Sequence, residues 1–205
     1  MVGLGGSGLS AIRELQQQGF QTVGIDAIDV GGGAAGRNGG FLLAGEAEFY
    51  HHAVKLHGRQ ETKQRYQETL KEPELMFKEF PGITNQCGSL RIAASEEEIK
   101  DCRVQFEMMK EDGFPVEWYK GSEGEGLLIP TDGTFNPMER CRALANIVMK
   151  LGARLYCQTK ALDVSGTQVT TANGVINCRR VIVAVDGKLE EILPELKHRV
   201  RTTRL

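Results

Sequence analysis

The chain has 205 residues, a length between that of one typical domain and that of two. Its 25 basic and 27 acidic residues leave a net charge of −2, so no basic field is available to hold a nucleic acid, and we expect no such partner. The five cysteines form no C-x-x-C pair, which favours reduced thiols over a disulfide framework or a zinc site. There is no apolar run of about 18 residues and no signal peptide, so we expect a cytoplasmic protein without a membrane span.

The first 26 residues have the pattern of a βαβ unit. Residues 3–8 read GLGGSG, apolar residues then recur with helical spacing as far as Gly19, and residues 22–25 predict a buried strand that ends at Asp26. The glycines fit G-x-G-x-x-G, and the acid lies 18 residues after Gly8, close to the usual spacing of about 20. This context predicts a dinucleotide site, with the pyrophosphate at the helix N-terminus and Asp26 on the ribose hydroxyls. A glycine-rich turn in another α/β fold is the alternative.

A second glycine cluster follows the second strand. Residues 31–40 read GGGAAGRNGG, in a place where an ordinary NAD dehydrogenase needs no further glycine. A cation and an amide held between glycines, Arg37 and Asn38, suit a loop that wraps an anionic ligand. A flexible surface loop remains the alternative interpretation of this segment.

The middle of the chain predicts helices and short strands. In chain order we expect two helices over 47–79 broken near Gly58, a strand over 88–93, a helix ending near Gly113, and strands over 116–119 and 127–129. Ser95 and Glu98 form a capping box at the start of the second helical region. His51, His52 and His57 share a predicted helix, but no two are at i and i+4, so no metal site is expected.

The last part of the chain predicts another helix and several strands. We expect a helix over 137–151 with proline in its first turn, a strand over 154–156, a hairpin over 169–176, and an apolar strand over 181–185. The hairpin is expected because the Asn173-Gly174 pair supplies the positive φ that a tight turn needs.

Three of these stretches resemble one known family. The loop ending Gly-Arg-Asn-Gly-Gly at residues 36–40 resembles the flavin-side loop of the FAD-dependent D-amino-acid oxidase superfamily, and it is most similar to the gamma-glutamylputrescine oxidase and D-amino-acid dehydrogenase branch. Residues 130–137 with the following helix and residues 152–156 are similar to a second family stretch. Residues 183–187 resemble a third, although Asp186 stands where the family usually has Asn or Gly.

The resemblance implies a fold and an activity. The fold is α/β, with a Rossmann-like (GR2-type) FAD-binding domain interrupted by part of an antiparallel-sheet substrate domain. The implied segments are residues 1–45 for the FAD-binding βαβ unit and flavin loop, 46–80 for a helical segment, 81–130 for the partial substrate domain, and 131–205 for the return to the FAD-binding domain. The implied reaction is oxidative deamination: the C–N bond of a small amine or amino acid is oxidised, with hydride passing to the flavin and later hydrolysis of the imine.

The resemblance also implies cofactor-binding residues, and it identifies no catalytic residue. Gly3, Gly5, Gly8 and Asp26 would hold the ADP portion of FAD; Arg37, Asn38, Gly39 and Gly40 would lie along the pyrophosphate and isoalloxazine; Ala161 occupies the position of a valine whose backbone meets adenine; and Ala184 and Gly187 would pass near the diphosphate.

Family members continue beyond the length of this chain, so we expect it to be an N-terminal portion that a C-terminal half or a second chain completes. Two other interpretations remain open at this stage. A nicotinamide-dependent dehydrogenase would explain the first glycine motif but not the second cluster, and a truncated non-catalytic chain would bind nucleotide weakly. The identity of the amine, the electron acceptor, the mode of flavin attachment and the oligomeric state are not encoded in these motifs.

Overall fold

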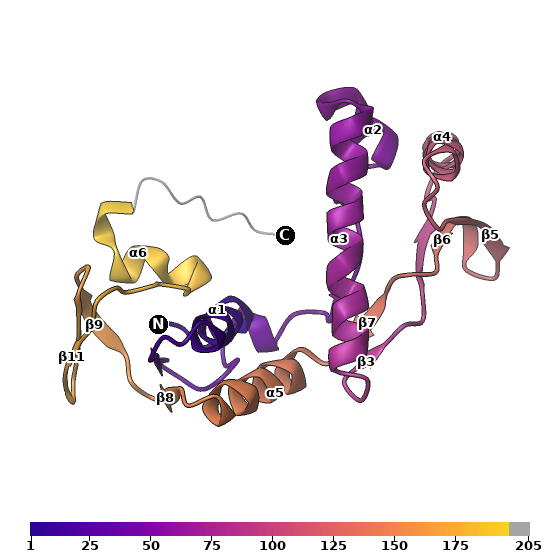
Figure 1. The fold of residues 1–205 in the computed structure, drawn as a ribbon. Helices are drawn as coiled ribbons and strands as arrows, with labels where there is room; N and C mark the ends of the chain where they lie inside the picture. The colour runs from indigo at the N-terminus through magenta and orange to yellow at the C-terminus, as the bar shows by residue number, and fades with distance from the viewer. Residues whose placement is uncertain (197–205) are drawn as a thin grey trace. The chain divides into compact units, whose positions relative to one another are not determined.

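The computed structural model describes residues 1–196, and the chain forms two compact units. One unit comprises Met1–Gly39 and Asn136–Leu205, and the other comprises Gly40–Phe135. The sequence-based boundaries lie a few residues away, at 45/46 and 130/131. Residues 197–205, the end of the segment expected to return to the FAD-binding domain, lie outside the described residues. Figure 1 shows the elements of both units in chain order.

The first unit contains a small parallel sheet. Strand β1 (Val23–Ile25) pairs in parallel with β8 (Arg154–Tyr156), with Val23 opposite Arg154. Val2 forms isolated parallel bridges to both Ile25 and Val183. The segment at Val2 therefore lies between β1 and the segment at Val183. Parallel neighbours joined through helices are the arrangement of a Rossmann-like fold.

Residues 181–185 correct one sequence-based prediction. An apolar strand was expected there, but the structure forms only the bridge at Val183. Its partner segment is equally short, because Val2 is followed at once by the glycine turn. Two backbone hydrogen bonds, from Val2 N to Ile182 O and from Ala184 N to Val2 O, both at 2.8 Å, make up the pairing.

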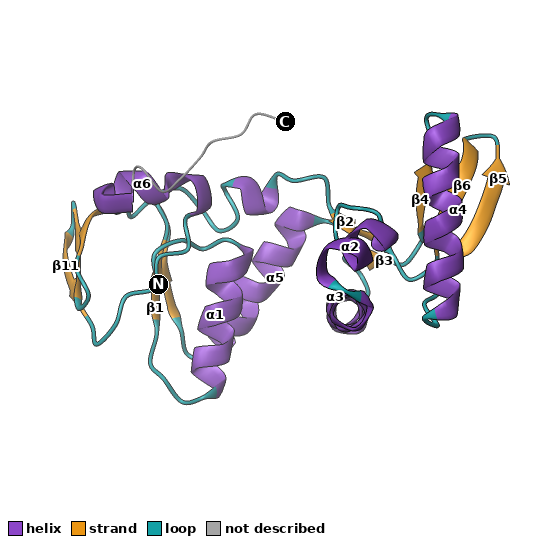
Figure 2. Cartoon of the chain, turned by 90° about the horizontal axis from the view of Figure 1, so that it is seen from above, coloured by secondary structure: helices purple, strands orange, loops and turns teal. Residues whose placement is uncertain are grey.

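Two amphipathic helices pack side by side in the first unit (Figure 2). They are α1 (Gly6–Gln17) and α5 (Pro137–Lys150). Their buried side chains include Leu9 on α1 and Leu144 on α5. Asn136 caps α5 by accepting a hydrogen bond from Glu139 N at 3.1 Å, and proline occupies the first turn, where its missing N–H costs nothing.

The first unit ends in an antiparallel sheet and short helical turns. The strands are β9 (Ala161–Val164), β10 (Gln168–Thr171) and β11 (Gly174–Asn177), with β10 in the middle. The predicted hairpin is confirmed, and its positive φ of 138° falls on Gly174. The helical turns are η1 (Ala34–Gly36), η2 (Asp186–Lys188), α6 (Leu189–Ile192) and η3 (Pro194–Leu196).

The second unit contains a three-stranded antiparallel sheet covered by a helix. Its strand order is β4 (Ser89–Ile92), β6 (Gly124–Ile129), β5 (Glu117–Gly121), and α4 (Glu96–Glu111) packs on β6. Ser95 caps α4 by accepting a hydrogen bond from Glu98 N at 3.2 Å, which confirms the predicted helix start.

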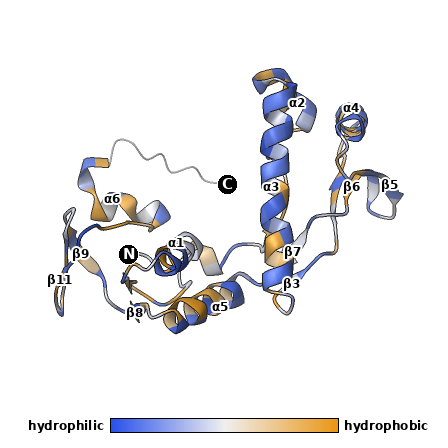
Figure 3. Ribbon diagram, viewed as in Figure 1, coloured by the Kyte–Doolittle hydropathy of each residue, from blue (hydrophilic) through white to orange (hydrophobic). Residues whose placement is uncertain are grey.

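The rest of the second unit consists of two helices and a short sheet. Helices α2 (Tyr50–His57) and α3 (Arg59–Glu79) meet at Gly58, whose φ of 86° breaks the helical path as predicted. The sheet order is β2 (Phe41–Leu42), β7 (Gly133–Phe135), β3 (Thr84–Asn85). Figure 3 shows that α3 is largely hydrophilic. Among the described residues, no helix is long and apolar enough to cross a bilayer.

Candidate functional site

A cavity of about 780 Å³ opens in the first unit, beside the glycine turn. Its lining brings together four segments that are distant in sequence: the turn before α1, the end of β1 with the loop after it, the start of β9, and the segment after Val183. Residues from these segments that line the cavity include Gly3, Gly5, Ser7, Asp26, Ala34, Asn38, Thr159, Lys160, Ala161, Ala184 and Asp186. This volume falls within the range of ligand pockets, about 300–1,000 Å³.

The glycine turn is too tight for side chains. Gly3 has a φ of 103°, and a Cβ there would lie 2.3 Å from the backbone oxygen of Ala184. A Cβ on Gly8 would lie 2.1 Å from the backbone oxygen of Gly3, so the third glycine lets α1 approach the preceding turn. The three roles expected of the motif, turn, ligand approach and helix packing, require this geometry.

The N-terminus of α1 faces the cavity without a side-chain cap. Its N-cap residue is Gly5, which has no side chain that could cap the helix. Both Gly6 and Ser7 line the cavity. The first N–H groups of a helix have no intrahelical partner, and the helix dipole gives them partial positive charge. This end of the cavity is therefore suited to an anion such as a pyrophosphate.

Asp26 links β1 to the glycine turn. Its Oδ2 accepts a hydrogen bond from Leu4 N at 2.8 Å, and its Oδ1 accepts one from Ile28 N at 2.9 Å. A carboxylate has about four acceptor positions, so two backbone donors leave capacity for ligand hydroxyls. Because Asp26 also lines the cavity, it can serve the structure and a ligand together.

The loop after β1 is held by its own side chains. Arg37 donates from Nε to Gly33 O at 3.3 Å and from its terminal nitrogen to Gly32 O. Asn38 donates from Nδ2 to Ala35 O at 2.9 Å. Asn38 lines the cavity, whereas Arg37 is not among the lining residues, so the guanidinium shapes the loop through backbone carbonyls.

A thiol and a carboxylate meet beside this loop. Burial raises the pKa of the Cys157 thiol, and its hydrogen bond to Asp29 raises the pKa further. The same hydrogen bond lowers the pKa of Asp29, and the N–H of Val30 adds to this effect. The pair ties the end of β8 to the loop, with the thiol protonated and the carboxylate ionised near neutral pH.

The structure brings together six of the eleven residues expected at the cofactor site. Those that line the cavity are Gly3, Gly5, Asp26, Asn38, Ala161 and Ala184. Those outside the lining are Gly8, which packs α1, Arg37 and Gly39 in the loop, Gly187 in η2, and Gly40, which belongs to the second unit.

Sequence reasoning missed several lining residues. Thr159 and Lys160 precede the expected Ala161 and could have been included on that ground, because neighbours of a lining residue lie beside the same cavity. Ile192 comes from α6, and no local sequence signal placed it near the glycine turn. Lys160 adds a cation to a lining that also carries Asp26 and Asp186.

The second unit has a separate cavity of about 840 Å³, with a buried acid in its lining. Asp132 is 3% exposed and accepts hydrogen bonds from Ser89 Oγ at 2.6 Å and Ala44 N at 3.0 Å. Burial raises the pKa of Asp132, and the two hydrogen bonds oppose that change. The carboxylate therefore joins three chain segments, and the aromatic rings of Tyr50 and Tyr66 share its cavity.

The fold and the glycine-lined cavity define an α/β protein with a candidate dinucleotide site, and comparison with known proteins identifies the family. The FAD dependent oxidoreductase family matches residues 1–204, so the chain belongs to that family. The family's cofactor is FAD, which removes a nicotinamide-dependent dehydrogenase as an alternative. The sequence-based assignments of family, fold and cofactor are confirmed.

Curated relatives match almost the whole chain at low identity. The probable oxidoreductase OrdL of Haemophilus influenzae is 25% identical over 97% of this chain and 50% of its own length. The gamma-glutamylputrescine oxidoreductase of Escherichia coli is 24% identical over 97% of this chain and 51% of its own length. The chain therefore spans about half the length of the curated relatives it matches.

Solved structures share the fold. Glycine oxidase from Geobacillus kaustophilus superposes with a TM-score of 0.73 at 20% identity, covering 96% of this chain and 57% of that one. L-Proline dehydrogenase from P. horikoshii gives a TM-score of 0.75 at 20% identity, covering 98% of this chain and 55% of that one. At these identities the similarity establishes the fold alone.

Proposed function

We propose that this chain binds FAD in the cavity beside the glycine turn and forms the cofactor-binding portion of an enzyme that oxidises the C–N bond of an amine or amino acid. The observation that carries the proposal is the convergence of Gly3, the uncapped start of α1 and Asp26 on one cavity. An anion-binding helix end and a ribose-binding acid are the two features that an ADP moiety needs.

Several residues around the cavity have a proposed role in holding FAD. The N–H groups at Gly5 and Gly6 would bind the pyrophosphate, Asp26 would accept hydrogen bonds from the ribose, and Ala161 would present its backbone to adenine. Arg37 would act indirectly, because its hydrogen bonds fix the loop that carries Asn38. When bound, the flavin supplies the hydride acceptor, while the protein supplies position and electrostatics.

The substrate class is inferred from the relatives. They include a gamma-glutamylputrescine oxidoreductase, a glycine oxidase and an L-proline dehydrogenase, and each of these three named compounds carries an oxidisable C–N bond. We propose the same class for the complete protein. A C-terminal half or a second chain would supply the remaining substrate contacts, since the relatives are about twice as long as this chain.

The visible spectrum of the purified chain tests cofactor binding. We expect flavin absorption as isolated or after incubation with FAD, with one FAD bound per chain. A folded chain that NAD saturates and FAD does not, or one that binds neither dinucleotide, would overturn the proposed site.

Substrate class needs a second experiment on the flavin-loaded protein. Anaerobic addition of a panel of amines and amino acids should bleach the flavin of a complete enzyme, made by joining this chain to the C-terminal half of a relative. Bleaching by alcohols or hydroxy acids, and not by any amine, would contradict C–N oxidation. FAD binding without bleaching by this chain alone would support a cofactor-binding portion that needs its other half.

A further inference from the structure

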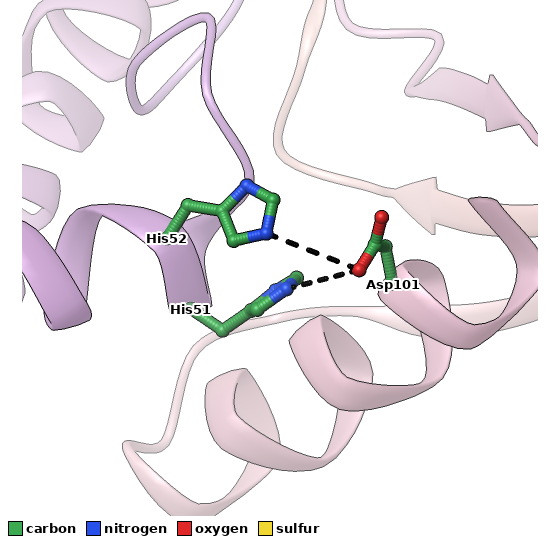
Figure 4. A group of neighbouring side chains, drawn as sticks. All are labelled: His51, His52 and Asp101. Atoms are coloured by element: carbon green, nitrogen blue, oxygen red, sulfur yellow. Dashed lines mark ion pairs between the residues drawn. The ribbon is translucent and has the colours of Figure 1, made fainter. Parts of the chain in front are cut away.

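Two histidines and an aspartate from different helices meet in the second unit (Figure 4). His51 and His52 are consecutive on α2, and Asp101 lies on α4, which packs against α2. Both rings direct a nitrogen toward the same carboxylate oxygen. The helix spacing alone did not indicate this group, because its third member is some fifty residues away in sequence.

The distances within this group suit a metal ion. His51 Nε2 lies 3.3 Å from Asp101 Oδ1, and His52 Nε2 lies 3.9 Å from the same oxygen. All three donor atoms lie within 4.8 Å of one another. Neighbouring ligands of a tetrahedral zinc stand roughly 3.3 Å apart, given bonds of about 2.0–2.2 Å. A small movement of the His52 side chain, which is 46% exposed, would complete the geometry.

A further carboxylate and one cation lie beside the two histidines. Glu48 Oε2 lies 3.8 Å from His52 Nδ1, in the position of the carboxylates that orient metal-bound histidines. The positive charge of Arg91 disfavours a second cation nearby. Its guanidinium lies 3.6 Å from the centre of the Phe49 ring, and this ring also contacts both histidines.

We propose that His51, His52 and Asp101 form a binding site for a divalent transition metal, with zinc as the reference ion. Two imidazoles and a carboxylate are a common zinc ligand set, and three protein ligands leave a coordination position for water. Because the ligands come from α2 and α4, the ion would cross-link these helices and stabilise the second unit. The site is separate from the proposed FAD cavity, whose lining residues all belong to the first unit.

Zinc titration of the full chain tests this proposal. After treatment with a chelator and a reductant, we expect one Zn²⁺ per chain by competition with a chromophoric chelator, and a higher Tm in the presence of zinc. His52→Gln and Asp101→Asn should weaken zinc binding by more than roughly tenfold, since even outer-shell partners cost about 10- to 100-fold. His51→Gln should do the same, but His51 is 12% exposed and its replacement can disturb packing.

Two variants control for other ligands. His57→Gln removes the remaining histidine of α2, and Cys87→Ser removes the exposed thiol; neither should change zinc affinity. Circular dichroism of His52→Gln and Asp101→Asn checks that both remain folded. Wild-type chain that takes up no zinc, folded His52→Gln and Asp101→Asn variants that bind as tightly as wild type, or loss of binding in Cys87→Ser would each overturn the site.

Discussion

Asp26 Oδ2 accepts a hydrogen bond from the backbone N–H of Leu4 at 2.8 Å. This contact joins the end of β1 to the middle of the glycine turn, so the residue proposed to bind ribose also fixes the backbone proposed to bind pyrophosphate. A second hydrogen bond, from Ile28 N to Asp26 Oδ1 at 2.9 Å, connects the same carboxylate to the following loop. The proposed ligand contact and the local structure therefore depend on one side chain.

Asp26→Asn should weaken both FAD binding and the local structure around the glycine turn. An amide presents only one acceptor oxygen, so its NH₂ group would face a backbone donor at Leu4 or Ile28, with a cost of about 1–3 kcal/mol to the free energy of unfolding. We expect FAD affinity to fall by roughly tenfold, equivalent to about 1.4 kcal/mol. Flavin fluorescence titration and thermal unfolding measure the two effects. Asp163→Asn, an exposed acid on β9, is the control, and equal FAD affinities for Asp26→Asn and wild type would contradict the proposed role.

Gly3→Ala should disrupt the turn through a steric clash. Gly19 provides a matched comparison, because its φ of 83° is also positive but its Cβ position is open. Gly19→Ala should therefore cost only the backbone strain of about 1–2 kcal/mol and leave FAD binding unchanged. In Gly3→Ala the new methyl group would meet the Ala184 oxygen at 2.3 Å. Loss of FAD binding and a larger fall in Tm are expected, and similar behaviour of the two variants would show that the clash is absorbed without cost.

Asp186→Asn should improve cofactor binding. Asp186 lines the cavity with a φ of 49°, a conformation that asparagine tolerates well, and its negative charge opposes an anionic ligand. The side chain is exposed, so the gain in FAD affinity should be only roughly threefold, within the range of exposed charge pairs. The difference should shrink as salt screens the charge. Titrations at low and high ionic strength measure it, with the exposed Glu195→Gln as control; unchanged or weaker binding by Asp186→Asn at low salt would refute this account.

Stability of the second unit should fall in acid because of Asp112. Its carboxylate accepts hydrogen bonds from Tyr50 Oη at 2.9 Å and from Arg59 Nε at 3.1 Å. Burial alone would raise the pKa of Asp112, but the hydrogen bonds from Tyr50 and Arg59, together with the positive charges of Arg59 and Lys63, lower it by more. A lowered folded-state pKa stabilises the protein above the unfolded value, about 3.9, and this contribution is lost as the pH falls through the folded-state pKa.

Urea unfolding across a series of pH values checks this dependence. Asp112→Asn should lower the free energy of unfolding by about 1.5–3 kcal/mol near neutral pH. It should also flatten the acid limb of the pH profile, the range in which the free energy of unfolding falls as the pH is lowered. Glu107→Gln, an exposed acid on α4, the helix that ends just before Asp112, should do neither. An acid limb that is as steep in Asp112→Asn as in wild type would assign the pH dependence to other carboxylates.

Local spacing in the sequence was sufficient to predict the elements that depend on neighbouring residues. The glycine turn with Asp26, the helix break at Gly58, the cap at Ser95 and the hairpin at Gly174 were all expected and are present. Each depends on backbone conformation or on hydrogen bonds within a few residues, apart from Asp26, whose position follows from a known motif.

Only the tertiary structure decided which distant residues meet. Residues 181–185 looked like a strand because they are apolar, yet the partner segment at Val2 is so short that only a bridge forms. Arg37 donates to backbone carbonyls of its own loop, an arrangement that the glycine-rich pattern did not indicate. The meeting of His51 and His52 with Asp101 depends on the packing of α2 against α4. Such contacts have no sequence period, because they are set by how separate elements pack.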